Sequence, residues 1–391
     1  MQRYTNSGQT IRAILALLAI TGNIGRPGAG WVYANLQTQV FDEVRDPIAF
    51  YPPEEPDGEV RVSISTARLG ADLLSQTDPP VRMAWIERGN PVTQNPDTNR
   101  VLEALRGLEF RVVVDQFLTD TAREADLVLP AKTMFEQTDV IGAYWHPYLQ
   151  LRQKILEPPG EVKPETEIYW LLGRRLGISE SQLAEGMPAP SDEAVEAFLE
   201  HRLADFEGLD LETLRRGPVV VPGHEEVAFA VGVFDTPSGR IELVSDEAVD
   251  RWGTDRLPRY REPEGFATGG DGPAADSLVL MTPNTKNRIH SQFGNLRMIR
   301  RLDPEPLVHV HPADARARGI ADGMSVRVHN QRGEFTLRCR VDAGLKRGCV
   351  SVTNGWWIQD GGTVNFCSPG LETDMGHGAA FHGTLVEVSP A

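Results

Sequence analysis

The chain has 391 residues, of which 40% are hydrophobic and 24% charged, and its formal net charge is −16. These values are typical of a folded protein of two or three domains and exclude an intrinsically disordered chain. The acidic excess argues against a nucleic-acid-binding surface, which needs clustered Lys and Arg, and the sequence contains no apolar run of about 18 residues that could span a membrane.

The first predicted element is a helix over Thr10 to Ile20, whose apolar run predicts a buried position. Arg12 interrupts the run and Thr21-Gly22 ends it as a helix stop, so a signal peptide is disfavoured. A glycine-rich loop follows at 22–30. Dinucleotide-binding glycine motifs follow a strand and open a helix. Because a helix precedes this loop, we expect a tight backbone crossing instead.

Residues 83 to 129 alternate between short apolar runs and amphipathic segments, which predicts a parallel sheet covered by helices. In such sheets ligands bind beyond the carboxyl ends of the strands. Asp115 stands at one of these ends, and a polar segment through Thr121 follows it, so we expect a ligand wall there. The predicted strands are 83–86, 110–114 and 127–129, with helices at 99–105 and 164–176.

The pattern changes twice after residue 177. Residues 178 to 275 are acidic and rich in Pro and Gly, which predicts an irregular connector with a linker at 265–273. Farther on, a two-residue alternation is clearest from 334 to 341 and predicts short strands closed into a barrel. The expected fold is an α/β parallel-sheet domain over 1–177, a connector over 178–275 and a mostly-β barrel domain over 276–391.

Several motifs together resemble the molybdopterin oxidoreductases of the dimethyl sulfoxide reductase family. The resemblance runs over nearly the whole chain in the family's order. It matches only the carboxyl-terminal half of that family, from its second α/β domain to its terminal, double-psi-like barrel, which binds the molybdopterin dinucleotide. The motifs lie at 22–30, 89–91, 115–130, 158–161, 282–293, 311–314 and 365–381.

The resemblance implies two molybdopterin guanine dinucleotides that clamp one molybdenum or tungsten. It implies that the α/β domains hold one dinucleotide and that the barrel contributes to both. Asn90, Asp115 and Glu165 would then contact a guanosine end, where a carboxylate can accept hydrogen bonds from the guanine N1–H and N2–H₂ groups. Asp115 has an alternative role as the N-cap of the helical turn that follows it.

The barrel loop at 282–292 is expected to bind the cofactor, because most of its side chains can donate or accept hydrogen bonds. A pterin edge and a pyrophosphate need fixed donors and cationic side chains. A solvated loop is the alternative, although Ile289 and Phe293 indicate packing. The resemblance adds a later segment, where Trp357 is equally a core residue. The cofactor-binding residues expected in the barrel domain are Thr282, Asn284, Lys286, Arg288, His290, Ser291, Gln292, Trp357, Asn365 and His382.

No metal ligand or catalytic residue is predicted in this chain. The family's iron–sulfur cysteines, its metal-binding side chain and its substrate pocket lie in its amino-terminal half. The three cysteines are too few and too scattered for an iron–sulfur cluster, and Cys367 is expected to be a packed or loop cysteine. Asp374, His377 and His382 could be taken for metal ligands, but their spacing fits no standard site.

The expected function is therefore that of the carboxyl-terminal, cofactor-binding half of a bis-pterin oxidoreductase acting on a small inorganic or organic substrate. Residues 139–148 favour the sulfur-compound or less-characterised branches. Catalysis is expected only once the missing amino-terminal half completes the site. The expected partners are the pterin cofactor and either that half or an iron–sulfur electron-transfer subunit of the same enzyme. The alternatives are a split subunit that binds the dinucleotide only, and a non-redox hydratase or transhydroxylase. We expect a cytoplasmic chain, with periplasmic export only through a leader on an upstream half or a partner.

Overall fold

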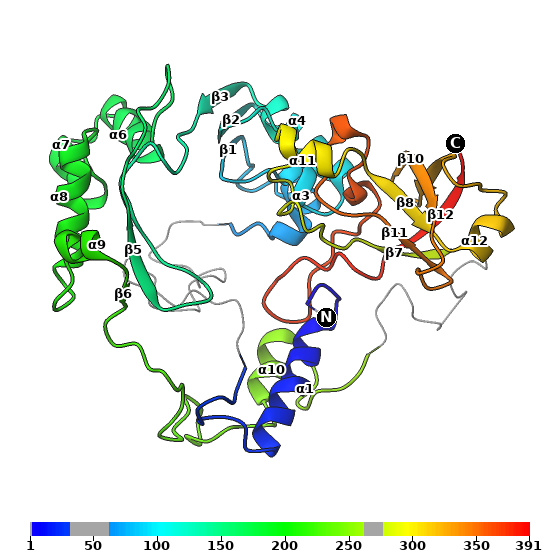
Figure 1. Ribbon diagram of the computed structural model, residues 1–391, viewed down its shortest axis with the longest axis horizontal. Helices are drawn as coiled ribbons and strands as arrows, with labels where there is room; N and C mark the ends of the chain where they lie inside the picture. Colours follow the sequence, from blue (N-terminus) through cyan, green and yellow to red (C-terminus); the bar gives the residue numbers. More distant parts are fainter. Residues whose placement is uncertain (1, 32–61, 262–276) are drawn as a thin grey trace.

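The computed structural model describes residues 2–31, 62–261 and 277–391. Within these ranges the strands form a parallel sheet, an antiparallel sheet and a closed barrel. The parallel sheet lies in the middle, the barrel lies on one side of it, and the antiparallel sheet with its helices lies on the other (Figure 1). The predicted fold class, a parallel α/β sheet followed by a β-barrel, is confirmed.

The parallel sheet has the order β1-β2-β3, and its strands match the predicted ones to within a residue at most ends. Asp115 pairs with Pro130, so the carboxyl ends of β2 and β3 lie at the same edge. Val112 and Val113 are almost fully buried, as a sheet covered on both faces requires. The strands are β1 (Met83–Glu87), β2 (Phe110–Asp115) and β3 (Leu127–Pro130).

Helices cover both faces of this sheet. Val101 and Leu105 of α4 (Thr98–Arg106) pack against Ala84 and Ile86 of β1. On the other face, Ile168 of α6 (Glu165–Arg175) packs near β2. The short elements beside the sheet are η2 (Thr66–Arg68), α2 (Leu69–Ser75), α3 (Pro91–Gln94) and α5 (Asp120–Arg123).

The barrel closes in the order β10-β8-β11-β7-β12-β9 and combines parallel with antiparallel pairs. Alternate residues of β10 point inward, as the two-residue repeat predicted, and Cys367 packs among them with no exposed surface. Burial raises the pKa of the Cys367 thiol to about 12, so it is a packed thiol, as expected. The strands are β7 (Leu278–Met281), β8 (Leu307–Val310), β9 (Ser325–His329), β10 (Glu334–Val341), β11 (Cys349–Ser351) and β12 (Leu385–Pro390).

Four short helical elements accompany the barrel strands. They are α11 (Arg297–Leu302), α12 (Pro312–Ala317), η4 (Ile358–Asp360) and η5 (Val364–Phe366). In Figure 1, α11 lies at the border between the barrel and the sheet. The connection after β11, which holds η4 and η5, carries the barrel-side residues that reach the sheet.

The expectation of an irregular segment is wrong for residues 180 to 216, which form α7 (Glu180–Gly186), α8 (Asp192–Leu203) and α9 (Leu211–Arg216). Each helix begins at a capping side chain, and leucines from α7 to α9 are buried. Those of α8 and α9 pack on the antiparallel sheet of β4 (Asp139–Ile141), β5 (Tyr148–Arg152) and β6 (Val219–Val220). Abundant acidic residues and prolines obscured this pattern in the sequence. The predicted linker at 265–273 lies outside the described residues, and the domain boundaries remain a prediction.

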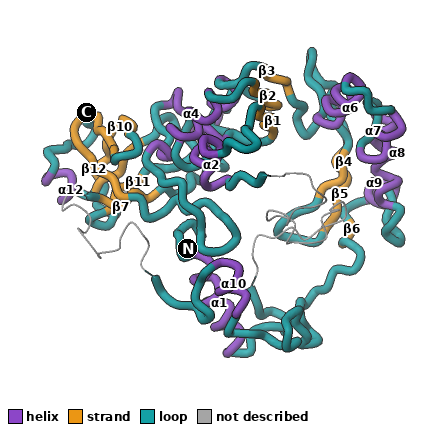
Figure 2. The backbone as a smooth tube through the Cα atoms, turned by 180° about the vertical axis from the view of Figure 1, so that it is seen from behind, coloured by secondary structure: helices purple, strands orange, loops and turns teal. Residues whose placement is uncertain are grey.

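Helix α1 (Ser7–Ile20) is present as predicted, but its expected burial is wrong. Leu17 is 59% exposed and Ile20 is 68% exposed, whereas the buried side chains are Ser7 and Gln9. The helix is held by polar contacts: Gln9 and Arg12 both donate to the carbonyl oxygen of Asp255. It therefore lies beside α10 (Asp246–Trp252) (Figures 1 and 2). Its side chains Leu17 and Ile20 stay exposed. Within the described ranges, no helix is long and apolar enough to cross a membrane.

The glycine-rich loop at 22–30 is a backbone crossing, as predicted. Gly25 has a φ of +74°, and a Cβ atom on it would lie 2.6 Å from the carbonyl oxygen of Phe229. A side chain cannot occupy that space without moving one of the two backbones. Glycine at position 25 therefore sets the distance between the loop and the segment around Phe229.

This crossing predicts a difference between two glycine substitutions. Gly28 has the same φ of +74° but nothing within 4 Å of its ideal Cβ. Gly28→Ala therefore carries only the left-handed backbone strain, on the order of 1 kcal/mol. Gly25→Ala adds the clash and should lower the free energy of unfolding by at least about 1 kcal/mol more. Urea denaturation measures both variants, and equal losses would contradict the crossing.

Candidate functional site

A cavity of about 670 Å³ lies between the parallel-sheet region and the barrel, and we call it the interdomain cavity. Thr66 and residues 93–96 line it from the sheet side, and loops between 282 and 382 line it from the barrel side. Its volume falls in the range of about 300–1,000 Å³ typical of ligand pockets. The predicted cofactor-binding residues that line it are Thr282, Asn284, His290, Ser291, Asn365 and His382.

The charge of the interdomain cavity differs from that of the protein. Among the described residues that line it there is no Asp or Glu, although the chain carries a net charge of −16. Arg3 is the cation of this lining, and burial lowers the pKa of His382, which favours a neutral imidazole. Side-chain amides, which both donate and accept hydrogen bonds, make up much of the remaining lining: Gln94, Asn95, Asn284, Asn354 and Asn365.

The loop at 282–292 is held by contacts with the segment at 354–357. The expected packing of Ile289 and Phe293 is wrong, because these side chains are 57% and 45% exposed. Asn354 donates to the carbonyl oxygen of Thr282 at 3.0 Å and to Oδ1 of Asn284 at 2.8 Å. Trp357 is buried, and its indole N–H donates to the carbonyl oxygen of Ser291 at 2.9 Å. Trp357 thus supports the cavity wall from behind and is not part of the lining.

Three predicted residues of this loop lie outside the cavity lining. The guanidinium of Arg288 is buried, pairs with Asp303 at 2.7 Å and stacks on the Trp356 ring at 3.3 Å from its centroid. Burial lowers the pKa of Arg288. Its charge is therefore paired with Asp303 and is not directed into the cavity. Lys286 and Gln292 are exposed.

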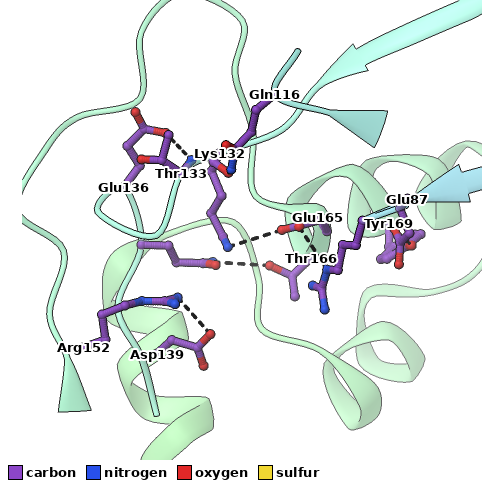
Figure 3. Close-up of polar contacts among 12 residues, drawn as sticks. Glu87, Gln116, Lys132, Thr133, Glu136, Asp139, Arg152, Glu165, Thr166 and Tyr169 are labelled. Carbon is purple, nitrogen blue, oxygen red and sulfur yellow. Dashed lines mark hydrogen bonds and ion pairs between the residues drawn. The ribbon is translucent and has the colours of Figure 1, made fainter. Parts of the chain in front are cut away.

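A second group of polar residues lies at the carboxyl edge of the parallel sheet, and we call it the strand-end cluster: Arg88, Asp115, Lys132 and Glu165. Glu165 begins α6, and one of its carboxylate oxygens lies 3.3 Å from Nζ of Lys132 (Figure 3). The other lies 3.2 Å from Nε of Arg88. Burial raises the pKa of Glu165, but its own backbone N–H, Lys132 and Arg88 outweigh this, and the net shift is downward. Glu165 is therefore a firmly ionised carboxylate.

Asp115 ends β2 and does not cap the next helix. That helix, α5, is capped by Thr119, whose hydroxyl accepts from the backbone N–H of Ala122 at 3.2 Å. Asp115 instead accepts from the backbone N–H of Phe117 at 3.1 Å, so the capping alternative is wrong. Burial raises the pKa of the Asp115 carboxyl, and the backbone hydrogen bonds of Phe117 and Gln116 only partly oppose this.

Asn90 lies between the two sites, in the interior. Its Oδ1 accepts from the backbone N–H and the hydroxyl of Thr121, and its Nδ2 donates to the hydroxyl of Thr93. It thus fixes the turn after β1. The residues of these sites not predicted from the sequence include Thr93, Gln94, Asn95 and Asn354 of the cavity, and Arg88 and Lys132 of the cluster. The rule that ligands gather after strand ends pointed to residues 88–95 and 132.

The residues considered as metal ligands have other contacts. The carboxylate of Asp374 accepts from the backbone N–H groups of Gly8 and Gln9, at the start of α1. His377 contacts Glu372 at 3.1 Å. In the ranges that the structure describes, no group of three His, Cys, Asp or Glu side chains is arranged to hold a metal ion.

Two known protein families match the chain, one over the region of the parallel sheet and one over the barrel. Residues 1–175 match the family described as molybdopterin oxidoreductase. Residues 278–385 match the family described as Molydopterin dinucleotide binding domain. The chain belongs to the molybdopterin oxidoreductases of the dimethyl sulfoxide reductase family.

The matches to individual relatives give the share of their length that this chain covers. "Probable oxidoreductase YoaE" of Bacillus subtilis is 34% identical over 396 residues, a match that covers 99% of this chain and 55% of YoaE. The dimethyl sulfoxide/trimethylamine N-oxide reductase of Cereibacter sphaeroides is 30% identical, with 90% of this chain and 44% of the reductase covered. The chain thus spans about half the length of the curated relatives it matches.

A solved structure shows the same fold. The acetylene hydratase from Pelobacter acetylenicus superposes with a TM-score of 0.67, covering 82% of this chain and 46% of the hydratase, at 20% sequence identity. This similarity extends across most of the chain, so the family resemblance includes the arrangement of the elements.

The pKa shifts predict opposite effects of two Asp→Asn substitutions. The pKa of Asp115 is raised in the folded protein, so at a pH above this pKa the buried charge destabilises the native state. Asp115→Asn removes the charge and with it this free-energy cost. The variant should be more stable at pH 7, by on the order of 1 kcal/mol at most. The gain should disappear as the pH falls to the ordinary aspartate pKa.

Asp126 is the matched control, because its hydrogen bonds with Arg111 lower its pKa. Asp126→Asn should therefore be less stable than the wild type at pH 7, and the loss should vanish as the pH falls through the lowered pKa. Thermal unfolding from pH 3 to pH 8 measures both. If Asp115→Asn and Asp126→Asn changed the stability in the same direction at neutral pH, the opposite directions of the two pKa shifts would be contradicted.

Proposed function

We propose that this chain forms the carboxyl-terminal, cofactor-binding half of a molybdenum or tungsten bis(molybdopterin guanine dinucleotide) oxidoreductase. The observation that carries the proposal is the interdomain cavity. Its lining is rich in amides and hydroxyls and, in the described part of the chain, free of carboxylates. A pterin offers donors and acceptors along its edge, and a pyrophosphate is anionic, so both suit this lining.

Thr93, Asn95, Asn284, Asn365 and His382 are the residues that would hold the pterin end. Three of them present a side-chain amide, whereas Thr93 lines the cavity with its hydroxyl already bonded to Asp120 and Asn90. Burial favours the neutral imidazole of His382, which can donate with one nitrogen and accept with the other. Arg3 would balance phosphate charge. The bound cofactor supplies two-electron redox chemistry at its metal, and the protein binds and orients it.

The strand-end cluster fits the guanosine end. A half-buried carboxylate such as Asp115 can accept from both N1–H and N2–H₂ of guanine, whereas adenine presents an acceptor at N1. The donors of a guanine edge would offset the burial that raises the pKa of Asp115. Arg88 and Lys132 neutralise Glu165 and leave the cluster without excess negative charge.

The amino-terminal half of such an enzyme, on the same or another polypeptide, would supply the metal ligand and the substrate pocket. An open cavity of about 1130 Å³ is lined by α1, the glycine-rich loop and segments at 144–147 and 224–229. Trp145 on its rim is 69% exposed, and α1 carries the exposed Leu17 and Ile20. We propose that the amino-terminal half covers this surface, because the relatives are nearly twice as long as this chain.

The substrate is proposed to be a small inorganic or organic compound, with sulfur compounds included. This rests on the names of relatives, among them a dimethyl sulfoxide/trimethylamine N-oxide reductase and a biotin sulfoxide reductase. Catalysis would require the completed enzyme.

The test is the cofactor content of protein produced, together with an amino-terminal half, in a host that makes the cofactor. Released pterin is measured by fluorescence, released guanine nucleotide by chromatography, and molybdenum and tungsten by mass spectrometry. The wild type should retain all three components. Metal-loaded protein without redox turnover would favour the hydratase alternative, and pterin without metal the binding-only alternative. Retention of neither pterin nor guanine would contradict the proposal.

Asp115→Ala should lower the retained guanine dinucleotide by about tenfold, because a charged hydrogen bond to the base is lost. Its circular dichroism and unfolding midpoint should stay close to those of the wild type. Asp126→Ala is the control and should retain the dinucleotide. Asp126 lies just before β3, and its exposed side chain pairs with Arg111. Unchanged retention in Asp115→Ala would remove Asp115 from the site.

A further inference from the structure

A buried carboxylate connects the sheet to the barrel. Asp120, the first residue of α5, is 4% exposed. Its Oδ2 accepts from the hydroxyl of Thr93 at 2.6 Å and from the backbone N–H of Ile358 at 2.9 Å. Thr93 belongs to the turn after β1, and Ile358 begins η4 on the barrel side, 238 residues along the chain from Asp120. One carboxylate oxygen therefore bonds both to the turn after β1 and to the barrel side.

Thr93 continues this connection into the cavity. Its carbonyl oxygen accepts from Nδ2 of Asn365 at 2.8 Å and from the hydroxyl of Thr363 at 3.4 Å, both on the barrel side. Thr93 and Asn365 both line the interdomain cavity. Ile358 is half-buried, and the other residues of this network are buried: Thr93, Asp120, Thr363 and Asn365. Their buried hydrogen-bonding groups would be left without partners if the interface opened only in part.

Helix capping does not account for Asp120. Thr119 already caps α5, which has four residues. The carboxylate of Asp120 reaches out of the helix, to the turn after β1 and across to the barrel. Its burial raises its pKa, so the fold keeps this carboxyl at an energetic cost that a capping role would not require.

We propose that Asp120 is a positioning residue that fixes the barrel on the parallel sheet and thereby sets the geometry of the interdomain cavity for the dinucleotide. The proposal rests on the proposed function, because it concerns the cavity in which the cofactor would lie. Asp120 acts through Thr93 and Asn365 and does not itself line the cavity.

Three variants separate this role from simple stabilisation. Asp120→Ala leaves the Thr93 hydroxyl and the Ile358 N–H without their acceptor. Asp120→Asn keeps one oxygen that can accept from both donors. Thr119→Ala is the matched control. It removes the hydrogen bond that caps the same helix, and that bond is made within α5 and not to the barrel.

Calorimetric unfolding and retained pterin are measured on protein produced, together with an amino-terminal half, in the host that makes the cofactor. In calorimetry, the wild type, Asp120→Asn and Thr119→Ala should each unfold in one transition that includes sheet and barrel. Asp120→Ala should show two separate transitions. Retained pterin should fall about tenfold in Asp120→Ala and by less than about twofold in Asp120→Asn and Thr119→Ala.

The outcomes distinguish this inference from the proposed function. Wild-type protein without pterin would contradict the proposed function, while the calorimetry still decides whether Asp120 couples the two parts. A single transition in Asp120→Ala, with unchanged amide exchange at Thr93 and Ile358, would overturn the positioning role. Equal pterin loss in Asp120→Ala and Thr119→Ala would overturn it as well, because both would then report loss of α5 alone.

Discussion

The hydrogen bonds around Thr93 are the constraint on which the rest of the site depends. This residue meets Asp120 through its hydroxyl and Asn365 through its carbonyl group, so it joins the sheet edge to the barrel. Each buried donor or acceptor left unpaired would cost about 1–3 kcal/mol. Few orientations of the barrel can satisfy all of these groups at once. The cavity has a defined shape because the two surfaces that line it meet in this one arrangement.

Around this joint, charge is distributed in a way that favours an anionic ligand. The protein is strongly acidic, yet the described lining of the cavity holds no carboxylate. Arg288 is buried against Asp303 and Trp356, where it stiffens the loop behind the lining. At the other site, Asp115 remains a half-buried carboxylate with a raised pKa. A fold tolerates such a cost where a ligand repays it, and functional sites commonly violate local stability in this way.

Much of the fold could be predicted because its signals are local. The apolar runs that form β1 to β3 and the alternation in β10 lie within single elements. Asp115 could be found because it follows a strand. Thr93 could not, since its importance depends on Asn365, 272 residues away in the chain. Arg288 was expected at a phosphate, but its partner Asp303 lies on another segment whose position only the folded structure shows. The apolar side chains of α1 predicted a buried helix, but Leu17 and Ile20 are exposed. Whether another segment covers an apolar helix face depends on the folded structure and not on the local sequence.

The central claim is that the sheet and the barrel together enclose the cofactor. Amide hydrogen exchange on cofactor-loaded protein and on the same protein stripped of cofactor tests it most directly. We predict that loading slows exchange together at residues 93–95 on the sheet side and at 290–291, 354–355 and 377–382 on the barrel side. Protection confined to the barrel segments, with residues 93–95 unchanged, would contradict the account.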